Sequence, residues 1–545
     1  MKQISAAEAI ELLKKGDNAK PLLTGYTITE PLAITEPFNS QPISDCKFQS
    51  VSITANAAIS FSFNGCAFAN GLELDGVTND YFGVSSCTMG GTLTIKNCNI
   101  LTLHIKGGTT NIHEVDFRGT KILHELMIRN VNHVSFDSKS SVEDRFLISE
   151  RCGSLYFDGK FKQLEMGKCT PIKESIKAHF VGTFNSIKVV RCKRVELHFD
   201  KLDADETSLI LNKESSLFFD SGKMKDVTIE GGHYLLMKFV AQTDIKLRVI
   251  KAKDSDAEKE KVSKEAQIDN LDLAAFIANE KNKLHFNNVD FRKVNLDSFD
   301  NYGFFQVNGS KIRDEILLTN TILRDANFND VEFLKTCTIN IRDSYLLKTT
   351  FTNVRWPSDY KIYPINNSPI SDLDPAELKK LRESYRQLKL NYISSGNKFE
   401  ALEFQKHEYD IHYEITKKDL GKNWRSWTLI GNFLIMWTHK YASVFSQSVL
   451  KPFAFLLGGH LVLFFFFLKV HSLGVEFGLD HPTCDAFWKG FGLYWTTMFP
   501  THPFDIISFY SNQKVNIMGG LDTLMRIWSA YFIFYFISAS RKYHL

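Results

Sequence analysis

Phenylalanines that close short runs of alternating apolar and polar residues recur about every twenty residues in the first half of the chain. They are Phe48, Phe68, Phe117, Phe136, Phe157, Phe180, Phe199, Phe219 and Phe239, with Met89 in the wide gap after Phe68. Alternation of this kind, as in the segments LTIKNCNI and VELHFD, is typical of strands with one buried face. A repeat of this length indicates a solenoid, in which stacked coils align equivalent side chains inside. We therefore predict a β-helix over residues 21–250.

Large apolar residues are more closely spaced after residue 284, at every fifth position. They are Phe286, Phe291 and Leu296, then Leu323, Phe328 and Phe333, and then Leu346, Phe351 and Trp356. The longer repeat resembles that of right-handed parallel β-helices. The stretches DANFNDVEF and LLKTTFTNVRW resemble the degenerate pentapeptide-repeat class, in which every fifth side chain points into the core. These resemblances imply pentapeptide-like β-helix coils over residues 284–360 and a mainly β fold up to that point.

Two segments outside these repeats have patterns of their own. Ten of the fifteen residues 251–265 are charged, so we expect a charged, solvated insertion over 251–283. A docking site for a partner protein is the alternative for this segment.

At the N-terminus, Ser5 and Glu8 have the spacing of a capping box, and we expect a capping helix over residues 1–20. This start also lacks the apolar core of a signal peptide, so the N-terminal part should lie in the cytosol.

A helical pattern replaces the strand pattern over residues 372–420. Asp374 and Pro375 suit the N-cap and the first turn of a helix, and the segment SSGN separates this helix from a second one. The apolar side chains of the first helix step by three and four residues: Leu378, Leu381, Tyr385, Leu388 and Tyr392. We predict a helical hairpin, similar to a single tetratricopeptide-type unit, which needs a neighbour to pack against.

Two apolar segments near the C-terminus are long enough for membrane helices. The first covers residues 452–468 and is interrupted only by His460. The second covers residues 521–540 and contains Arg526, which could reach the interface from near one end. With helical ends added, each approaches the roughly 20 residues that cross a bilayer. We therefore predict a two-span α-helical membrane module over residues 448–545.

Lysine and arginine predict how these spans are oriented. The tryptophan-rich residues 421–447 are expected to form a helix in the membrane interface. The basic residues flanking the spans are Lys417, Lys418, Lys422, Arg425, Lys440, Lys451, Arg541 and Lys542, whereas residues 469–520 contain only Lys469, Lys489 and Lys514. The positive-inside rule then places both termini in the cytoplasm and the intervening loop outside.

The segment between the spans contains an aromatic run, CDAFWKGFGLYWTTMF, that is too short to cross a bilayer. We predict a re-entrant segment over residues 484–505, because the order span, short helix, Thr-Thr, extended segment, span resembles the pore module of two-helix potassium channels. The resemblance implies these pore-lining residues: Thr496, Thr497, Met498, Phe499, Pro500 and Thr501. His460 and Arg526 are the polar residues expected within the membrane.

The same segment also departs from a potassium channel. A filter resembling TVGYG needs glycines whose backbone can adopt left-handed angles, and no glycine follows Thr496 and Thr497 here. Potassium selectivity is therefore not supported, and a non-selective or differently selective pore is expected. An interfacial lid that holds the two spans together is the alternative for residues 484–505.

A family resemblance joins the hairpin to the membrane module. The segment YRQLKLNYISSGNKFEALEFQKHEYD, followed about 45 residues later by a hydrophobic hairpin, is similar to a bacterial group of pentapeptide-repeat membrane proteins. Their C-terminal two-helix modules look like potassium-channel pores, and the similarity covers roughly residues 280–545. It implies a location in the lipid bilayer of the bacterial inner membrane. Because two helices do not enclose a water-filled path, a pore requires a homo-oligomer, with a tetramer favoured.

Composition removes several other classes of function. Lys and Arg total 65 against 62 Asp and Glu, a net charge of +3, so no nucleic-acid partner is expected. The nine cysteines include no CxxC pair. No Walker, GxGxxG, HExxH or GxSxG motif occurs, so we expect no enzyme activity, catalytic residue, metal or cofactor.

Two hypotheses account for these features. The first is a homo-oligomeric membrane ion channel or pore with a large cytoplasmic β-helix that senses a protein partner or scaffolds a complex. The alternative is a non-conducting, membrane-tethered β-helix interaction scaffold, with stress response or phage defence as its setting.

Overall fold

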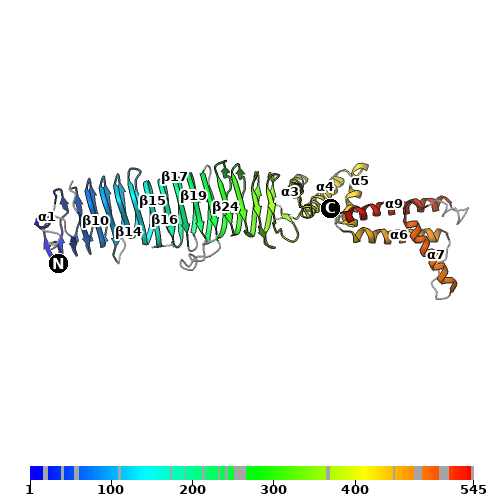
Figure 1. The fold of residues 1–545 in the computed structure, drawn as a ribbon, viewed down its shortest axis with the longest axis horizontal. Helices are drawn as coiled ribbons and strands as arrows, with labels where there is room; N and C mark the ends of the chain where they lie inside the picture. Colours follow the sequence, from blue (N-terminus) through cyan, green and yellow to red (C-terminus); the bar gives the residue numbers. More distant parts are fainter. Residues whose placement is uncertain are drawn as a thin grey trace. The chain divides into compact units, whose positions relative to one another are not determined.

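The chain divides into two compact units, Met1–Asn367 and Ser368–Leu545. A computed structural model describes residues 1–15, 23–37, 42–54, 60–108, 112–171, 175–190, 192–211, 215–230, 233–239, 243–250, 266–363, 369–445, 448–471, 481–502 and 515–541. Figure 1 shows a ladder of short strands in the first unit and the helices of the second.

The first unit is a parallel β-solenoid. Its strands are β1 (Lys2–Ile4), β2 (Tyr26–Ile28), β3 (Leu32–Ile34), β4 (Pro42–Ser44), β5 (Lys47–Phe48), β6 (Val51–Ile53), β7 (Phe61–Asn64), β8 (Ala67–Phe68), β9 (Leu72–Asp75), β10 (Thr78–Met89), β11 (Thr92–Lys96), β12 (Asn99–Gly107), β13 (Ile112–Arg118), β14 (Lys121–Phe136), β15 (Ser141–Pro171), β16 (Ile176–Val190) and β17 (Val195–Ile210). They continue as β18 (Ser215–Phe219), β19 (Gly222–Glu230), β20 (His233–Phe239), β21 (Thr243–Ile250), β22 (Ala266–Asp272), β23 (Ile277–Ala278), β24 (Lys283–Asn287), β25 (Val289–Asn295), β26 (Asp300–Asn301), β27 (Phe304–Asn308), β28 (Lys311–Thr319), β29 (Asn327–Asn329), β30 (Glu332–Phe333), β31 (Thr338–Arg342), β32 (Thr350–Thr352) and β33 (Ile362–Tyr363). The ladders between these described strands are parallel, and β23 and β26 form a small sheet apart from the rest.

The phenylalanine repeat forms the central column of the solenoid core. Phe180 on β16 pairs in register with Phe199 on β17, and Phe199 pairs with Phe219 on β18. The ring centroids of these pairs are 5.1 and 5.3 Å apart, and the rings are stacked and fully buried. One ring therefore rests on the next at the spacing of the strands. The prediction of a parallel β-helix core is confirmed.

The five-residue pattern also packs into the solenoid core, with Leu323, Phe328 and Phe333 buried and Phe351 and Trp356 partly buried. Phe328 of β29 pairs with Phe351 of β32, with ring centroids 5.4 Å apart. Phe333 and Trp356 stack at 5.0 Å in the same coils. The last described strand of these coils is β33, so the strands continue just past residue 360, where the predicted range ends.

The boundary predicted for the charged insertion was wrong after residue 265. Residues 251–265 lie outside the described residues, but 266–283 belong to the solenoid, with β22 paired to β20 and β25. The physical reason is that the charged run stops at Glu265 and a buried alternating pattern begins. Its buried members include Ala266, Ile268 and Leu271.

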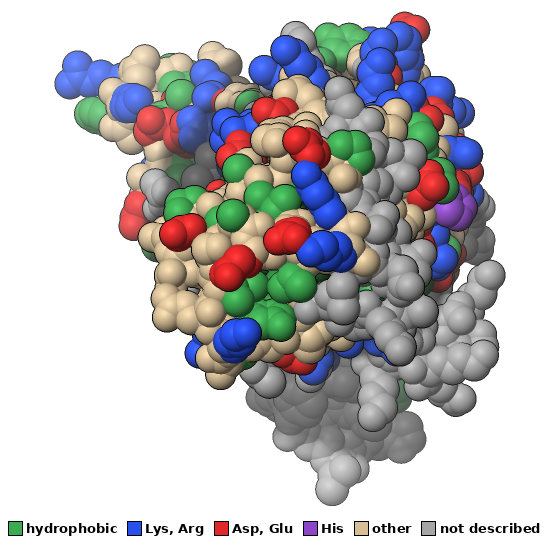
Figure 2. All heavy atoms as spheres, turned by 90° about the vertical axis from the view of Figure 1, so that its left-hand side faces the viewer, with side chains coloured by type: hydrophobic (Ala, Val, Ile, Leu, Met, Phe, Trp, Pro, Cys, Tyr) green, Lys and Arg blue, Asp and Glu red, His purple; other side chains and the backbone are tan. Residues whose placement is uncertain are grey.

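Helix α1 (Ala6–Lys15) lies between β1 and β2 and packs Ala9 and Leu13 into the first coil. Its predicted capping box is present, because Ser5 donates its backbone N–H to Glu8 Oε2 at 2.8 Å and Glu8 donates its own to Ser5 Oγ at 3.3 Å. Residues 16–20 of the predicted cap lie outside the described residues. Figure 2 looks at this end of the molecule, where charged, polar and hydrophobic side chains are mixed.

The second unit is helical within its described residues. Its helices are α3 (Pro375–Ser394), α4 (Lys398–Lys422), α5 (Trp427–Ser443), α6 (Leu450–His471), α7 (His481–Met498) and α9 (Val515–Arg541). Helices α3 and α4 form the predicted hairpin, with Asp374 accepting the backbone N–H of Glu377 at 2.7 Å as the N-cap. Tyr392 and Phe404 stack between the two helices at 5.6 Å.

Among the described residues, one helix is long and apolar enough to cross a membrane, over Leu450–Leu468 of α6. Helix α9 is long enough, but Asp522 and Arg526 lower its hydropathy. Length and composition therefore support one membrane span and leave the second of the two predicted spans without that support.

Candidate functional site

Helices α6, α7 and α9 pack around a small apolar core. Its buried side chains include Phe464 and Phe467 of α6, Tyr494 and Met498 of α7, and Met525 and Phe532 of α9. Helices α6 and α9 lie along one another in the ribbon drawing (Figure 1). The end of α7 carries the residues predicted to line a pore, so this three-helix bundle is the candidate site.

Gly459 lets α6 and α9 approach closely. A Cβ at Gly459 would lie 2.0 Å from Cζ2 of Trp528, so the indole ring occupies the space of a side chain. The indole Nε1 donates a hydrogen bond to the carbonyl of Phe455 at 3.1 Å, one turn earlier on α6. Gly458, next in the chain, has no such neighbour within 4 Å.

His460 joins all three helices through one buried imidazole. Its Nε2 lies 3.2 Å from Oγ1 of Thr497 on α7, and its Nδ1 lies 3.2 Å from Oγ of Ser529 on α9. The Thr497 hydroxyl also faces the carbonyls of Leu493 and Tyr494 at 3.0 and 3.2 Å, so its single proton is used there. The contacts are all satisfied when His460 Nε2 donates to Thr497 and Nδ1 accepts from Ser529.

A second buried polar cluster lies where α7 ends. His502 Nε2 is 2.7 Å from Oδ1 of Asp522, and Arg526 Nε donates to Oδ2 of the same carboxylate at 2.7 Å. His502 Nδ1 lies 2.7 Å from the carbonyl of Phe499, and Arg526 Nη1 donates to the carbonyl of Pro500 at 3.2 Å. Both His502 ring nitrogens therefore lie within hydrogen-bond distance of an oxygen acceptor. The cluster fastens the turn after α7 to α9.

The six residues predicted to line a pore do not share one surface. Thr496, Phe499 and Thr501 are exposed on the protomer, and Thr496 Oγ1 donates only to its own helix, at Gly492 O, 2.8 Å away. Thr497 and Met498 are buried inside the bundle. Consecutive residues of a helix point to different sides, because each is rotated by about 100° from the one before it.

Both polar residues predicted within the membrane contact the segment that was predicted to line a pore. His460 reaches Thr497, and Arg526 reaches the backbone of Pro500. The sequence prediction did not include Ser529, His502 or Asp522. A signal for Asp522 was present, because Asp522 and Arg526 have the four-residue spacing of an ion pair on one helix face.

The outer faces of these helices are apolar and exposed. On α6 these side chains are Leu461, Val462, Phe465 and Phe466, on α7 they are Trp488, Phe491 and Trp495, and on α9 they are Leu524, Ile527, Phe534 and Ile537. Phe465 and Phe534 are 62% and 66% exposed. Such a surface is unfavourable in water. The bundle therefore has apolar side chains both in its core and on its outer faces, and its polar clusters lie inside.

Comparison of the chain with protein-family models, with curated proteins and with solved structures found no match.

Proposed function

We propose that the chain is a homo-oligomeric ion channel or pore of the bacterial inner membrane, with the solenoid as a cytoplasmic sensor or scaffold. The observation that carries this proposal is the distribution of side chains on α6, α7 and α9. Their buried polar groups, His460, Thr497, Asp522 and Ser529, lie within an apolar core, and large aromatic and aliphatic side chains are exposed on the outside. This distribution suits lipid surroundings, in which polar groups must be satisfied internally.

On this proposal α9 is the second span despite its two charges. Asp522 is fully buried and accepts from both His502 and Arg526, so neither charge of the Asp522–Arg526 pair has to face lipid alone. Burial with a hydrogen-bonded partner reduces the cost of an ionisable group in a membrane. The termini are then both cytoplasmic, and α7 is a re-entrant helix. The solenoid belongs to the right-handed, pentapeptide-like class.

A pore requires several copies, because two spans and one re-entrant helix do not enclose a column of water. Thr496 and Thr501 remain exposed on the protomer and are the hydroxyls available to line a path between copies. Thr497 has a different part in the proposal: it ties α7 to His460 and so holds the lining segment in place.

The first test is the subunit count of the purified full chain in lipid nanodiscs, by mass photometry, followed by recording in planar bilayers. A discrete oligomer of four or more subunits that conducts supports the proposal. A monomer contradicts it. A dimer that does not conduct favours the tethered scaffold. The burial of Thr497 and Met498 inside one protomer also favours that alternative.

The adjacent threonines separate lining from support. Thr496→Val is expected to change single-channel conductance and to leave thermal stability unchanged, because the side chain is exposed and its hydroxyl donates to Gly492 O on the same helix. Thr497→Val removes the partner of a buried imidazole and is expected to cost about 1–3 kcal/mol of stability. Thermal unfolding in nanodiscs and bilayer recording measure the two effects. Unchanged currents in Thr496→Val would remove Thr496 from the lining.

A further inference from the structure

A hollow on the outer face of the solenoid arises at Gly83. Phe82 and Val84 of β10 are buried, so the alternating residues Tyr81, Gly83 and Ser85 belong to the outer face. Gly83 pairs in register with Ser62 of β7 before it and with His104 of β12 after it. Every other member of this row has a side chain, whereas the space beside Gly83 is shared by the end of the Tyr81 ring and a cavity, which we name the Gly83 hollow. Its volume is about 230 Å³.

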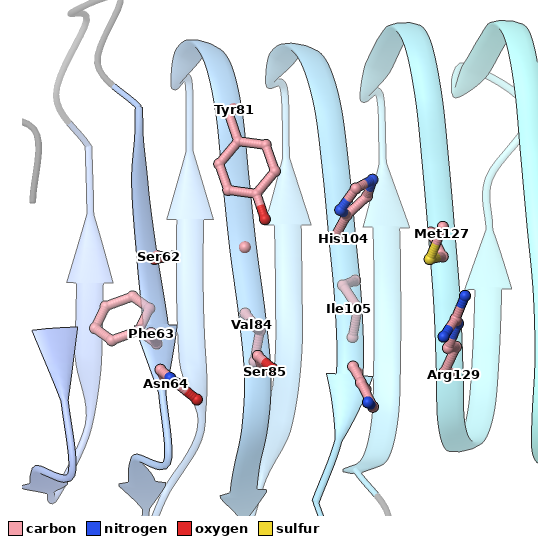
Figure 3. Close-up of a pocket in the computed structure, with 12 residues that line it drawn as sticks. Ser62, Phe63, Asn64, Tyr81, Val84, Ser85, His104, Ile105, Met127 and Arg129 are labelled. Carbon is pink, nitrogen blue, oxygen red and sulfur yellow. The ribbon is translucent and has the colours of Figure 1, made fainter. Parts of the chain in front are cut away.

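Tyr81 and His104 form the wall of the hollow. The two rings meet edge to face with centroids 5.5 Å apart, and His104 Nε2 is held 3.1 Å from Oε2 of Glu125. The Tyr81 hydroxyl lies over Gly83, 2.7 Å from where a Cβ would be. Figure 3 shows Tyr81 and His104 on one side of the hollow, with Asn64, Ser85 and Arg129 along the other.

The other side is a row of hydrogen-bond donors with a positive charge. Ser85, Lys106 and Arg129 occupy the same register position on β10, β12 and β14, so their bases are about 5 Å apart. Lys106 has no ion-pair partner among the described residues, and Arg129 uses Nη1 for a 3.7 Å contact to Glu150 while its buried Nε has no hydrogen-bond partner. None of the described residues that line the hollow is Asp or Glu.

We propose that the Gly83 hollow binds a small phosphate monoester. The phosphate group would lie against Ser85, Lys106 and Arg129, because a dianion can accept from a hydroxyl, an ammonium and a guanidinium together. The body of the ester would lie beside the Tyr81 ring, which itself covers Gly83, and against Ser62 and Asn64. The volume is below that of pockets for drug-sized ligands, which limits the body to about the size of one sugar ring.

The test is isothermal titration calorimetry on the full chain in detergent, with glucose 6-phosphate, glucose and inorganic phosphate as probes. We expect glucose 6-phosphate to bind, glucose not to bind and inorganic phosphate to bind more weakly, with affinity falling as salt rises. Equal affinity for inorganic phosphate and the ester would overturn the assignment of the hollow to the ester body, and the absence of binding by either phosphate would overturn the site.

Two variants locate the binding. Lys106→Ala is expected to weaken glucose 6-phosphate about tenfold or more, whereas Lys188→Ala, an exposed lysine on β16 outside the hollow, should have no effect. Gly83→Val has to push the end of the Tyr81 ring into the hollow, because a Cβ there would lie 2.7 Å from the Tyr81 hydroxyl, so it should abolish ester binding and retain that of inorganic phosphate. Circular dichroism confirms that each variant is folded. Ester affinity that is the same in Lys106→Ala and Gly83→Val as in the parent chain would contradict the proposal.

Discussion

Neighbouring phenylalanines on β18 have opposite surroundings. Phe219 is fully buried between Phe199 and Phe239, with ring centroids 5.3 and 4.7 Å away, whereas Phe218 faces outward and stacks on His198 at 4.4 Å. We expect Phe219→Ala to lower the free energy of unfolding by about 3–5 kcal/mol through the cavity it leaves. Phe218→Ala removes one cross-strand contact and should cost about 0.2–1 kcal/mol.

Chemical denaturation, monitored by circular dichroism, measures the free energy of unfolding of both variants. In a solenoid this loss of stability should appear in the first unfolding transition, because each coil is stabilised by its direct neighbours. Equal losses for the two variants would mean that the stacked column does not supply the core energy assigned to it.

The outward histidine stack predicts a pH dependence of stability. His179 and His198 lie parallel with centroids 4.4 Å apart, and burial, followed by the charge of His198, lowers the pKa of His179. The unfolded value is about 6.5. A lowered pKa in the fold means that the unfolded chain binds more protons, so this stability is present above about pH 6.5 and is lost as the pH falls through the folded pKa.

We therefore expect His179→Gln to flatten the loss of thermal stability between about pH 7.5 and pH 5.5, measured as the melting temperature of the full chain. Glu196, Asp220 and Lys177 act on the same imidazole and stay in place in this variant. His124→Gln, at a largely exposed histidine on β14, is the matched control. A His179→Gln profile as steep as that of the parent chain would show that another group carries the dependence.

At the scale of elements, the contact of α6 with α9 depends on one glycine. Because Trp528 already occupies the position of a Cβ at Gly459, Gly459→Leu has to push the helices apart, and we expect a loss of about 1–3 kcal/mol from overpacking. Gly458→Leu adds the same side chain where nothing lies within 4 Å, so it should be close to neutral for the protomer. Thermal unfolding in nanodiscs compares them, and an equally destabilised Gly458→Leu would argue against this packing.

The elements that could be predicted are those set by local periodicity. The phenylalanine ladder, the capping box at Ser5 and Glu8 and the hairpin cap at Asp374 each depend on residues close in sequence, and each is present. The start of β22 was missed because a window over 251–283 averages a charged run with the buried alternation that follows it.

The polar clusters of the bundle were harder to predict because their partners are far apart in sequence. His460 meets Ser529 across 69 positions, and His502 meets Asp522 across 20. Periodicity gives no information on which faces of α6, α7 and α9 meet, so Arg526 was treated as a lone charge. In the structure Arg526 is paired with Asp522 on the same helix.

At the scale of the whole molecule, charge predicts which side of the membrane holds the solenoid. The cations before α6 include Lys417, Lys418 and Lys422, whereas residues 469–520 contain three lysines and no arginine. On the positive-inside rule the solenoid is cytoplasmic. Trypsin added to spheroplasts of a bacterial host should therefore leave Met1–Asn367 uncleaved, while trypsin added to inside-out vesicles should cleave within Met1–Asn367, where Lys121 and Lys225 are exposed. A periplasmic marker protein, degraded only in the first preparation, shows that the protease was active on that side. Cleavage of the solenoid in spheroplasts would reverse the topology, and with it the assignment of the solenoid as a cytoplasmic sensor.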